Sequence, residues 1–189
     1  MNSKRIIVLV GPSGSGKTTI GEKLSEKGLH KLVTTTTRVP RAGETDGVDY
    51  YFRNVDELDP KDFIEQTIYN HRLYGLTKSE VSQALDRYPL VHVSLDKNGA
   101  RAMKQAFPEE TLIIFLTVSA EDMKKRMECR GDAPQKIIER LTFSEETDEL
   151  KPLDEADVIL ENRTVEETVE SIFSVIDGSR QADISANGA

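Results

Sequence analysis

The chain has 189 residues, enough for one domain with a sizeable core, and its 37% hydrophobic and 31% charged residues are typical of a soluble globular protein. Its 33 acidic residues outnumber its 25 basic ones, which argues against general nucleic-acid binding and means that any positively charged site must be gathered locally. The single cysteine, Cys129, excludes an internal disulfide. No apolar run is long enough to span a membrane or to form a signal peptide, so we expect a cytoplasmic protein with no membrane partner.

The N-terminal region contains a phosphate-loop motif, because residues 11–18 read GPSGSGKT and match G-x-x-x-x-G-K-[ST] at every fixed position. The apolar run 6–10 before it predicts a buried strand, and residues 19–27 after it predict a helix. In that context the glycines let successive backbone N–H groups turn toward a phosphate chain, and the helix N-terminus adds its dipole. The alternative is a Gly/Ser-rich turn that binds nothing, which the flanking strand and helix disfavour.

This motif predicts an ATP site that uses Mg²⁺. Lys17 is expected to reach the β- and γ-phosphates, and the Thr18 hydroxyl is expected to help hold the metal. The predicted ATP-binding residues of the loop and of the first helical turn are Gly11, Pro12, Ser13, Gly14, Ser15, Gly16, Lys17, Thr18 and Thr19.

Alternating strand and helix patterns predict an α/β fold with a parallel sheet and right-handed crossovers. Buried strands are expected at residues 6–10, 31–35, 90–95, 111–118 and 157–160. Capping patterns predict helices that begin after Thr77, Ser119 and Thr164. A further helix is expected over 53–65 and a hairpin over 67–74, and the polar residues from about Gly178 predict a disordered tail.

Several charged residues admit two interpretations. Arg38 and Arg41, three apart in a Gly- and Pro-rich loop, would suit a bidentate grip on a phosphate together with Tyr50, although residue types alone favour a solvated loop. Asp96 ends the third strand at the sheet edge where ligands bind, and it is expected there as a metal or substrate ligand or simply as a helix cap. The charges of 124–140 are expected either on a solvated face or in a site.

Longer stretches of the sequence resemble the guanylate kinase family. Residues 34–52, TTTTRVPRAGETDGVDYYF, look like its nucleoside-monophosphate loop and follow the phosphate loop at the separation that the family shows. The similarity covers about residues 5–176 and continues through Phe63-Ile64-Glu65, Tyr74-Gly75, Asp96 with Gly99, Lys125-Arg126, Arg130-Gly131, Arg140-Leu141 and Asn162.

The resemblance implies a P-loop NTPase fold in one domain, with a parallel five-stranded sheet flanked by helices. A small mixed α/β subdomain that binds the monophosphate is inserted at about 35–88, and a helical lid spans about 126–144. The core then comprises about 1–34, 89–125 and 145–177, and residues 178–189 form the tail.

The resemblance also implies transfer of the ATP γ-phosphate to GMP, a step of purine nucleotide metabolism. Arg126, Arg130 and Arg140 resemble lid arginines that neutralise charge on the transferring phosphoryl group. Together with Lys17 and Arg38 they are the implied catalytic residues.

Further roles follow from the same resemblance. Asn162 resembles the residue beside the adenine ring, and Thr18 and Asp96 are the implied metal ligands. The implied GMP-binding residues are Thr34, Arg38, Arg41, Glu44, Tyr50, Glu65, Tyr74 and Asp96, and Thr77 is expected to join them in place of Leu76.

Base recognition is where this sequence departs from the family. Glu65 keeps the acid that suits the N–H donors of guanine, but Leu76 replaces a hydroxyl residue and Ser94 replaces an aspartate. Each lost hydrogen-bond partner costs about 1–3 kcal/mol if nothing compensates. Thr77, one residue on, would compensate for Leu76, so the departures concern the identity of the acceptor more than kinase activity.

Three functions are therefore compatible with the sequence. The leading one is an ATP:GMP phosphotransferase, followed by a kinase of the same fold for another phosphorylated acceptor, and by a weakly active GMP-binding scaffold. The intact phosphate loop argues against the scaffold, since a pure binding module does not need one. We expect ATP and GMP as partners, no nucleic acid, and a monomer or homodimer.

Overall fold

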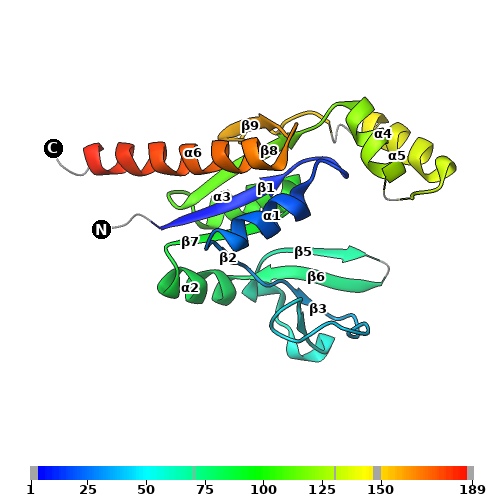
Figure 1. Cartoon of the computed structure of the whole chain (residues 1–189). Coiled ribbons are helices and arrows are strands. Elements are labelled where there is room, and N and C mark those ends of the chain that lie inside the picture. The colour runs from blue at the N-terminus through cyan, green and yellow to red at the C-terminus, as the bar shows by residue number, and fades with distance from the viewer. Residues whose placement is uncertain (1–3, 70, 130, 147–149, 187–189) are drawn as a thin grey trace.

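Two sheets and the helices around them form the structure in Figure 1, a computed structural model that describes residues 4–69, 71–129, 131–146 and 150–186. The larger sheet has five strands, all parallel, in the order β2-β7-β1-β8-β9. Its strands are β1 (Arg5–Val10), β2 (His30–Lys31), β7 (Leu90–Ser94), β8 (Thr111–Thr117) and β9 (Val158–Glu161). The predicted fold class, a parallel five-stranded sheet flanked by helices, is confirmed.

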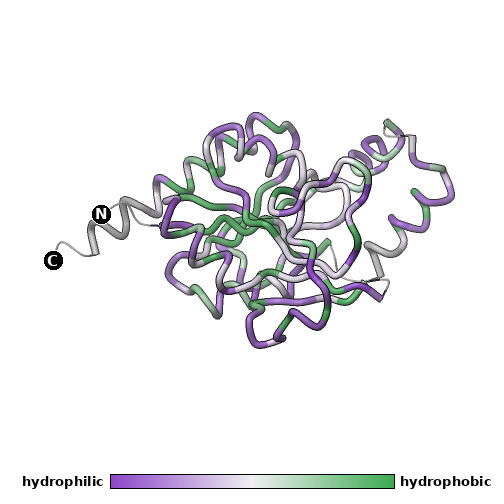
Figure 2. Tube along the Cα trace, turned by 90° about the horizontal axis from the view of Figure 1, so that it is seen from below, coloured by the Kyte–Doolittle hydropathy of each residue, from purple (hydrophilic) through white to green (hydrophobic). Residues whose placement is uncertain are grey.

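Alternating side chains of β1 serve both faces of this sheet, as the pleat of a strand requires. Ile7 and Leu9 pack toward α1 (Lys17–Glu26) and α6 (Val165–Ala186). Ile6 and Val8 lie in the cluster on the other face, which includes side chains of α2 (Lys78–Arg87) and α3 (Lys97–Ala106). Figure 2 shows the result as a hydrophobic centre that follows the strands, with polar helix faces and loops around it.

The smaller sheet lies in the insert between β2 and β7 and has the order β4-β3-β6-β5. Its strands are β3 (Thr35–Thr36), β4 (Tyr51–Phe52), β5 (Phe63–Tyr69) and β6 (Arg72–Thr77). The β5–β6 pair is antiparallel, so the predicted hairpin is confirmed, whereas β3 and β4 pair in parallel. The insert is anchored to the main sheet, because fully buried Leu76 of β6 belongs to the same cluster as Ile6.

Two predicted elements of this region are wrong. The helix expected over 53–65 is replaced by two 3-10 helices, Val55–Glu57 and Pro60–Asp62, and by the start of β5. Asp59 accepts the Lys61 N–H and Pro60 can only begin a helical turn, after which Phe63 is buried against the sheet. The single strand expected over 31–35 is two strands, since β2 pairs with β7 and β3 pairs with β6.

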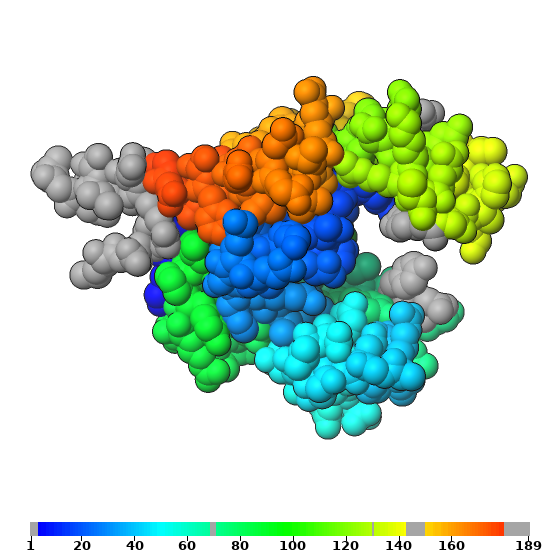
Figure 3. All heavy atoms as spheres, viewed as in Figure 1, coloured from blue at the N-terminus to red at the C-terminus, as the bar shows by residue number. Residues whose placement is uncertain are grey.

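The stretch expected to form a lid, about 126–144, falls on α4 (Ala120–Cys129) and α5 (Pro134–Glu146), which pack around a hydrophobic cluster of Met123, Met127 and Ile137. In Figure 3 these two helices and the insert project on the same side of the molecule, with a notch between them. Among the helices of the described chain, none combines the length and the apolar character that a membrane span requires.

The expected disordered tail is also wrong for most of its length. Helix α6 continues past Gly178 to Ala186, and residues 187–189 lie outside the described part of the chain. A tertiary contact supports the helix at this point, because Arg5 Nε donates to Ser179 Oγ at 3.4 Å and Ser179 in turn donates to the Ile176 carbonyl at 2.8 Å.

Candidate active site

The phosphate loop runs from the end of β1 to the start of α1, as predicted. Gly16 caps α1 with a left-handed φ of 95°, and a Cβ there would collide with the amide of Asn162. A Cβ at Gly11 would collide with the Leu116 carbonyl of β8. Glycine is therefore required by conformation at one end of the loop and by close backbone approach at the other.

Lys17 folds back over the loop that precedes it. Its Nζ donates to the carbonyls of Gly11 at 2.6 Å and Pro12 at 2.9 Å. The ammonium group is thus held at the mouth of the loop, where a phosphate chain would meet it.

A hollow of about 570 Å³ opens beside the loop, between α1, β7 and the segment that precedes β4. Lys17 and Thr18 line it from the phosphate loop, while Thr34 and Tyr50 line it from the insert. Ser94, at the end of β7, lies on the same wall. The hollow is therefore lined both by residues expected to bind ATP and by residues expected to bind GMP.

The donor set of this hollow is compatible with Mg²⁺, which keeps several waters and needs only one or two protein ligands beside substrate phosphates. Thr18, Ser94 and Asp49 bring two hydroxyls and a carboxylate to the lining, although Asp49 Oδ2 also accepts the Thr45 N–H at 2.8 Å. In the described ranges no cluster of three or more acid, His or Cys side chains could cage a metal. Asp96 is not among the lining residues.

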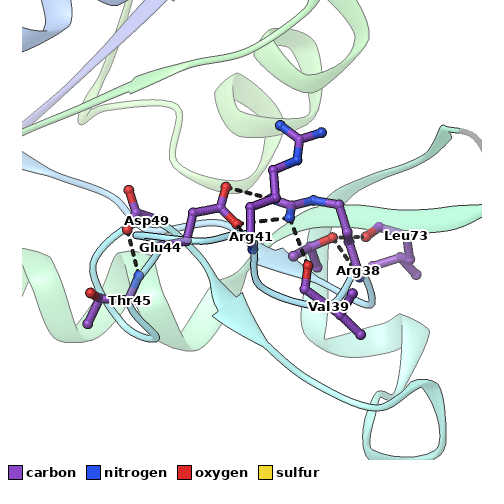
Figure 4. A network of polar contacts seen from close by, with 8 residues as sticks. Arg38, Val39, Arg41, Glu44, Thr45, Asp49 and Leu73 are labelled. Carbon is purple, nitrogen blue, oxygen red and sulfur yellow. Dashed lines mark hydrogen bonds and ion pairs between the residues drawn. The ribbon is translucent and has the colours of Figure 1, made fainter.

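One carboxylate organises the loop within residues 34–52 that is expected to hold the acceptor, as Figure 4 shows. Arg38 donates to both oxygens of Glu44, each at 2.8 Å, and the backbone N–H of Arg41 donates to the same carboxylate at 2.7 Å. The Arg38 and Arg41 hydrogen bonds lower the pKa of Glu44 to about 2, so the carboxylate stays charged at neutral pH. The exposed Arg41 guanidinium is not committed to this carboxylate.

Two aromatic rings also lie close to the Arg38 guanidinium. Its carbon lies 5.4 Å from the Tyr50 ring centroid and 5.7 Å from that of Phe52. The Tyr50 and Tyr74 rings meet edge to face at 6.0 Å. The structure thus brings together Arg38, Tyr50 and Tyr74, three of the four residues expected to hold the acceptor phosphate, and the fourth, Arg41, follows in the same loop.

Glu65 and Asp96 form an acidic pair on the insert side of α3. A Cβ at Gly99 would lie 3.3 Å from Glu65 Cγ and 3.4 Å from Asp96 Oδ1, so both acids crowd this glycine. Burial raises the pKa of Glu65 to about 7, the charge of Asp96 adds to the rise, and a hydrogen bond from the Leu76 backbone opposes it. Asp96 also caps α3, since its Oδ1 accepts the Gly99 N–H at 2.7 Å.

The structure does not support Thr77 as the replacement for the hydroxyl missing at Leu76. The Thr77 hydroxyl accepts the Glu80 N–H at 3.2 Å and caps α2. Successive side chains of a strand point to opposite faces, and Leu76 faces the core. Thr77 is therefore a helix cap, and only its position next to Leu76 suggested another role.

Two of the predicted lid arginines reach the phosphate loop. Arg126 of α4 donates to the Asn162 carbonyl and lies 3.4 Å from the Gly14 carbonyl. Arg140 of α5 donates to the Ser13 hydroxyl. Arg130, the third, lies outside the described residues.

Two buried residues have roles that the sequence did not reveal. Asn162 is 2% exposed and donates to the Ser15 carbonyl at 2.7 Å, so its amide holds the phosphate loop rather than an open site. His92 lines the hollow with Nε2 2.7 Å from Ser25 Oγ, and burial lowers its pKa to about 4. In the sequence, only the presence of a polar residue inside a buried strand could have indicated a special role for His92.

The phosphate loop on a parallel sheet, with arginines of α4 and α5 converging on it, places the chain among P-loop phosphotransferases. The family model for guanylate kinase matches residues 3–179. The chain is 33% identical over 181 residues to a guanylate kinase of Prochlorococcus marinus, covering 93% of this chain and 98% of that protein. It is 36% identical over 183 residues to one of Thermus thermophilus, covering 94% and 82%.

A solved structure of guanylate kinase from Anaplasma phagocytophilum has the same fold, with a TM-score of 0.69 and 24% identity over 95% of this chain and 88% of that one. This chain belongs to the guanylate kinase family.

Proposed function

We propose that this chain transfers the γ-phosphoryl group of ATP to GMP and releases ADP and GDP. The observation that carries the proposal is the hollow lined by Lys17 and Thr18 from the phosphate loop and by Thr34 and Tyr50 from the insert. Phosphoryl transfer requires two anionic substrates to meet in line, and most of the catalysis comes from that positioning and from charge stabilisation.

The phosphate loop would hold the donor. Its backbone N–H groups and the N-terminus of α1 bind the β- and γ-phosphates, and Lys17 exchanges the carbonyls of Gly11 and Pro12 for phosphate oxygens. Thr18 would help to hold Mg²⁺, which neutralises the charge between the terminal phosphates when it is bound with ATP. Asp96 would act on the acceptor side, because it lies beside Glu65.

The insert would hold the acceptor. Glu44 and the aromatic rings fix Arg38, whose remaining N–H groups, with Arg41, Tyr50 and Tyr74, would bind the GMP phosphate. Thr34 and Glu65 would bind the base, because an ionised Glu65 accepts from the two adjacent N–H donors of guanine.

The lid would close over the transferring group. Arg126 and Arg140 already contact the phosphate loop, and Arg130 would join them to neutralise charge that develops during transfer. Closure would also exclude water and so protect ATP from hydrolysis.

The test is an ADP-release assay with Mg·ATP and a panel of GMP, dGMP, AMP, UMP and CMP, with Lys17→Ala as the control variant. We expect turnover with GMP that the control abolishes. Turnover with a different monophosphate alone would move the chain to another acceptor. Tight GMP binding without any turnover would refute the kinase proposal and favour a scaffold.

A further inference from the structure

We propose that Asn162 is a positioning residue that sets the shape of the phosphate loop from behind, so that its loss weakens binding of the triphosphate chain whatever base is attached. Asn162 follows the last strand, β9, and its side chain is 2% exposed. That burial leaves little of the amide available to a ligand in the open hollow.

The amide is fixed in one orientation by its two neighbours. The atom 2.7 Å from the Ser15 carbonyl must be Nδ2, because a carbonyl can only accept. Oδ1 then faces Thr168 Oγ1 at 3.0 Å, and that hydroxyl shares its proton with the Thr164 carbonyl at 2.8 Å. The first turn of α6 therefore orients an amide that holds the phosphate loop.

The hydrogen bond from Asn162 holds Ser15, the residue directly before those that would contact phosphate. Ser15 precedes Gly16, and a Cβ on Gly16 would occupy the space of Asn162 Nδ2. The close packing of amide and glycine fixes the turn into α1, and so fixes the direction of the N–H groups of Gly16 and Lys17.

The backbone of Asn162 also makes hydrogen bonds to β8 and to an arginine of α4. Its N–H donates to the Thr117 carbonyl at the end of β8 at 2.9 Å. Its carbonyl accepts from Arg126 of the lid, whose other terminal nitrogen lies 3.4 Å from the Gly14 carbonyl. One residue thus joins the sheet, the phosphate loop and the lid arginine, which a residue that only contacts adenine would not need to do.

The inference rests on the proposed use of ATP, and the decisive probe is inorganic tripolyphosphate, which has no base. Binding of tripolyphosphate, Mg·ATP and GMP is measured by calorimetry for the wild type, for Asn162→Ala and for Ile172→Val. Ile172 is a fully buried core residue of α6, so its variant reports a general loosening of that helix.

We expect Asn162→Ala to weaken tripolyphosphate and Mg·ATP equally, by about tenfold for one lost buried hydrogen bond, and to leave GMP affinity within about twofold. Ile172→Val should leave all three unchanged. Weaker binding of ATP with unchanged binding of tripolyphosphate would assign Asn162 to the adenine and overturn the proposal. An equal loss of affinity in Ile172→Val would overturn it as well. A wild type that binds neither ATP nor tripolyphosphate would instead refute the proposed function.

A milder variant covers the case in which Asn162→Ala does not fold. Thr168→Val keeps the shape of its side chain and removes only the hydroxyl that orients the amide. We expect it to shift the amide NMR signals of Gly16 and Lys17 and to weaken tripolyphosphate in the same direction. Unchanged signals and unchanged affinity in this folded variant would overturn the proposal.

Discussion

The acidic pair of Glu65 and Asp96 predicts a pH-dependent affinity for GMP. An ionised Glu65 accepts from guanine, whereas a protonated Glu65 presents a hydroxyl hydrogen to a donor and loses one of the two hydrogen bonds. Burial and the nearby charge of Asp96 raise the pKa of Glu65 to about 7. The ionised fraction then falls from about ten elevenths at pH 8 to about one eleventh at pH 6, so the KM for GMP should rise over this range, by about tenfold at most.

The assay is the KM for GMP at saturating Mg·ATP between pH 5.5 and 8.5. The phosphate of GMP also titrates, near pH 6, so the wild-type profile is divided by that of Glu65→Gln, which keeps the shape and has no ionisable group. Asp96→Asn removes the neighbouring charge but keeps a good helix cap, and it should move the midpoint to lower pH. Parallel profiles for the wild type and Glu65→Gln would refute the reasoning.

Three other predictions concern stability. Thr77→Ala should lower the free energy of unfolding by about 1 kcal/mol through loss of the α2 cap and leave the preference among acceptors unchanged, and an altered preference in the assay panel would contradict the assignment of Thr77 as a cap. Leu76→Ala should cost about 2–5 kcal/mol in urea unfolding because this side chain is fully buried, and a cost below 1 kcal/mol would argue against its shared core position. Burial holds the pKa of His92 in the folded protein at about 4, below its ordinary 6.5, so the unfolded chain binds the proton more tightly. The free energy of unfolding should therefore fall by up to about 3 kcal/mol as the pH drops from 6.5 to 4. Urea unfolding at pH 7, 5 and 4 should show a smaller fall for His92→Gln than for the wild type.

The main sheet and its helices follow from local signals in the sequence. The apolar run of β1, the glycines of the phosphate loop and the caps at Thr77, Ser119 and Thr164 each specify their own structure within a few residues. These signals are strong because an uninterrupted run of apolar, β-branched residues and a capping side chain can each be recognised within a few positions of the chain.

Elements whose structure depends on distant partners could not be predicted in this way. The apolar residues Phe63 and Ile64 suit a helix or a strand, and the pairing of β5 with β6 decides between them. Likewise, no local sequence pattern around Lys31 and Thr35 indicates that these two residues belong to different sheets. The hydrogen bond from Asn162 to Ser15 also joins two residues that are far apart in the chain, so its geometry is absent from any local pattern.

The common cluster under both sheets has a consequence for how acceptor preference can change. Leu76 and Val81 of the insert share their packing with Ile6 and Val8 of the central strand, so a replacement at Leu76 must satisfy both the nucleotide and the interior of the protein. The loop that carries Arg38 and Glu44 is exposed over residues 39–43 and is not part of this cluster. Acceptor preference on the Leu76 side is therefore tied to the stability of the whole domain, and loops exchanged between relatives are expected to be tolerated where exchanged β6 strands are not.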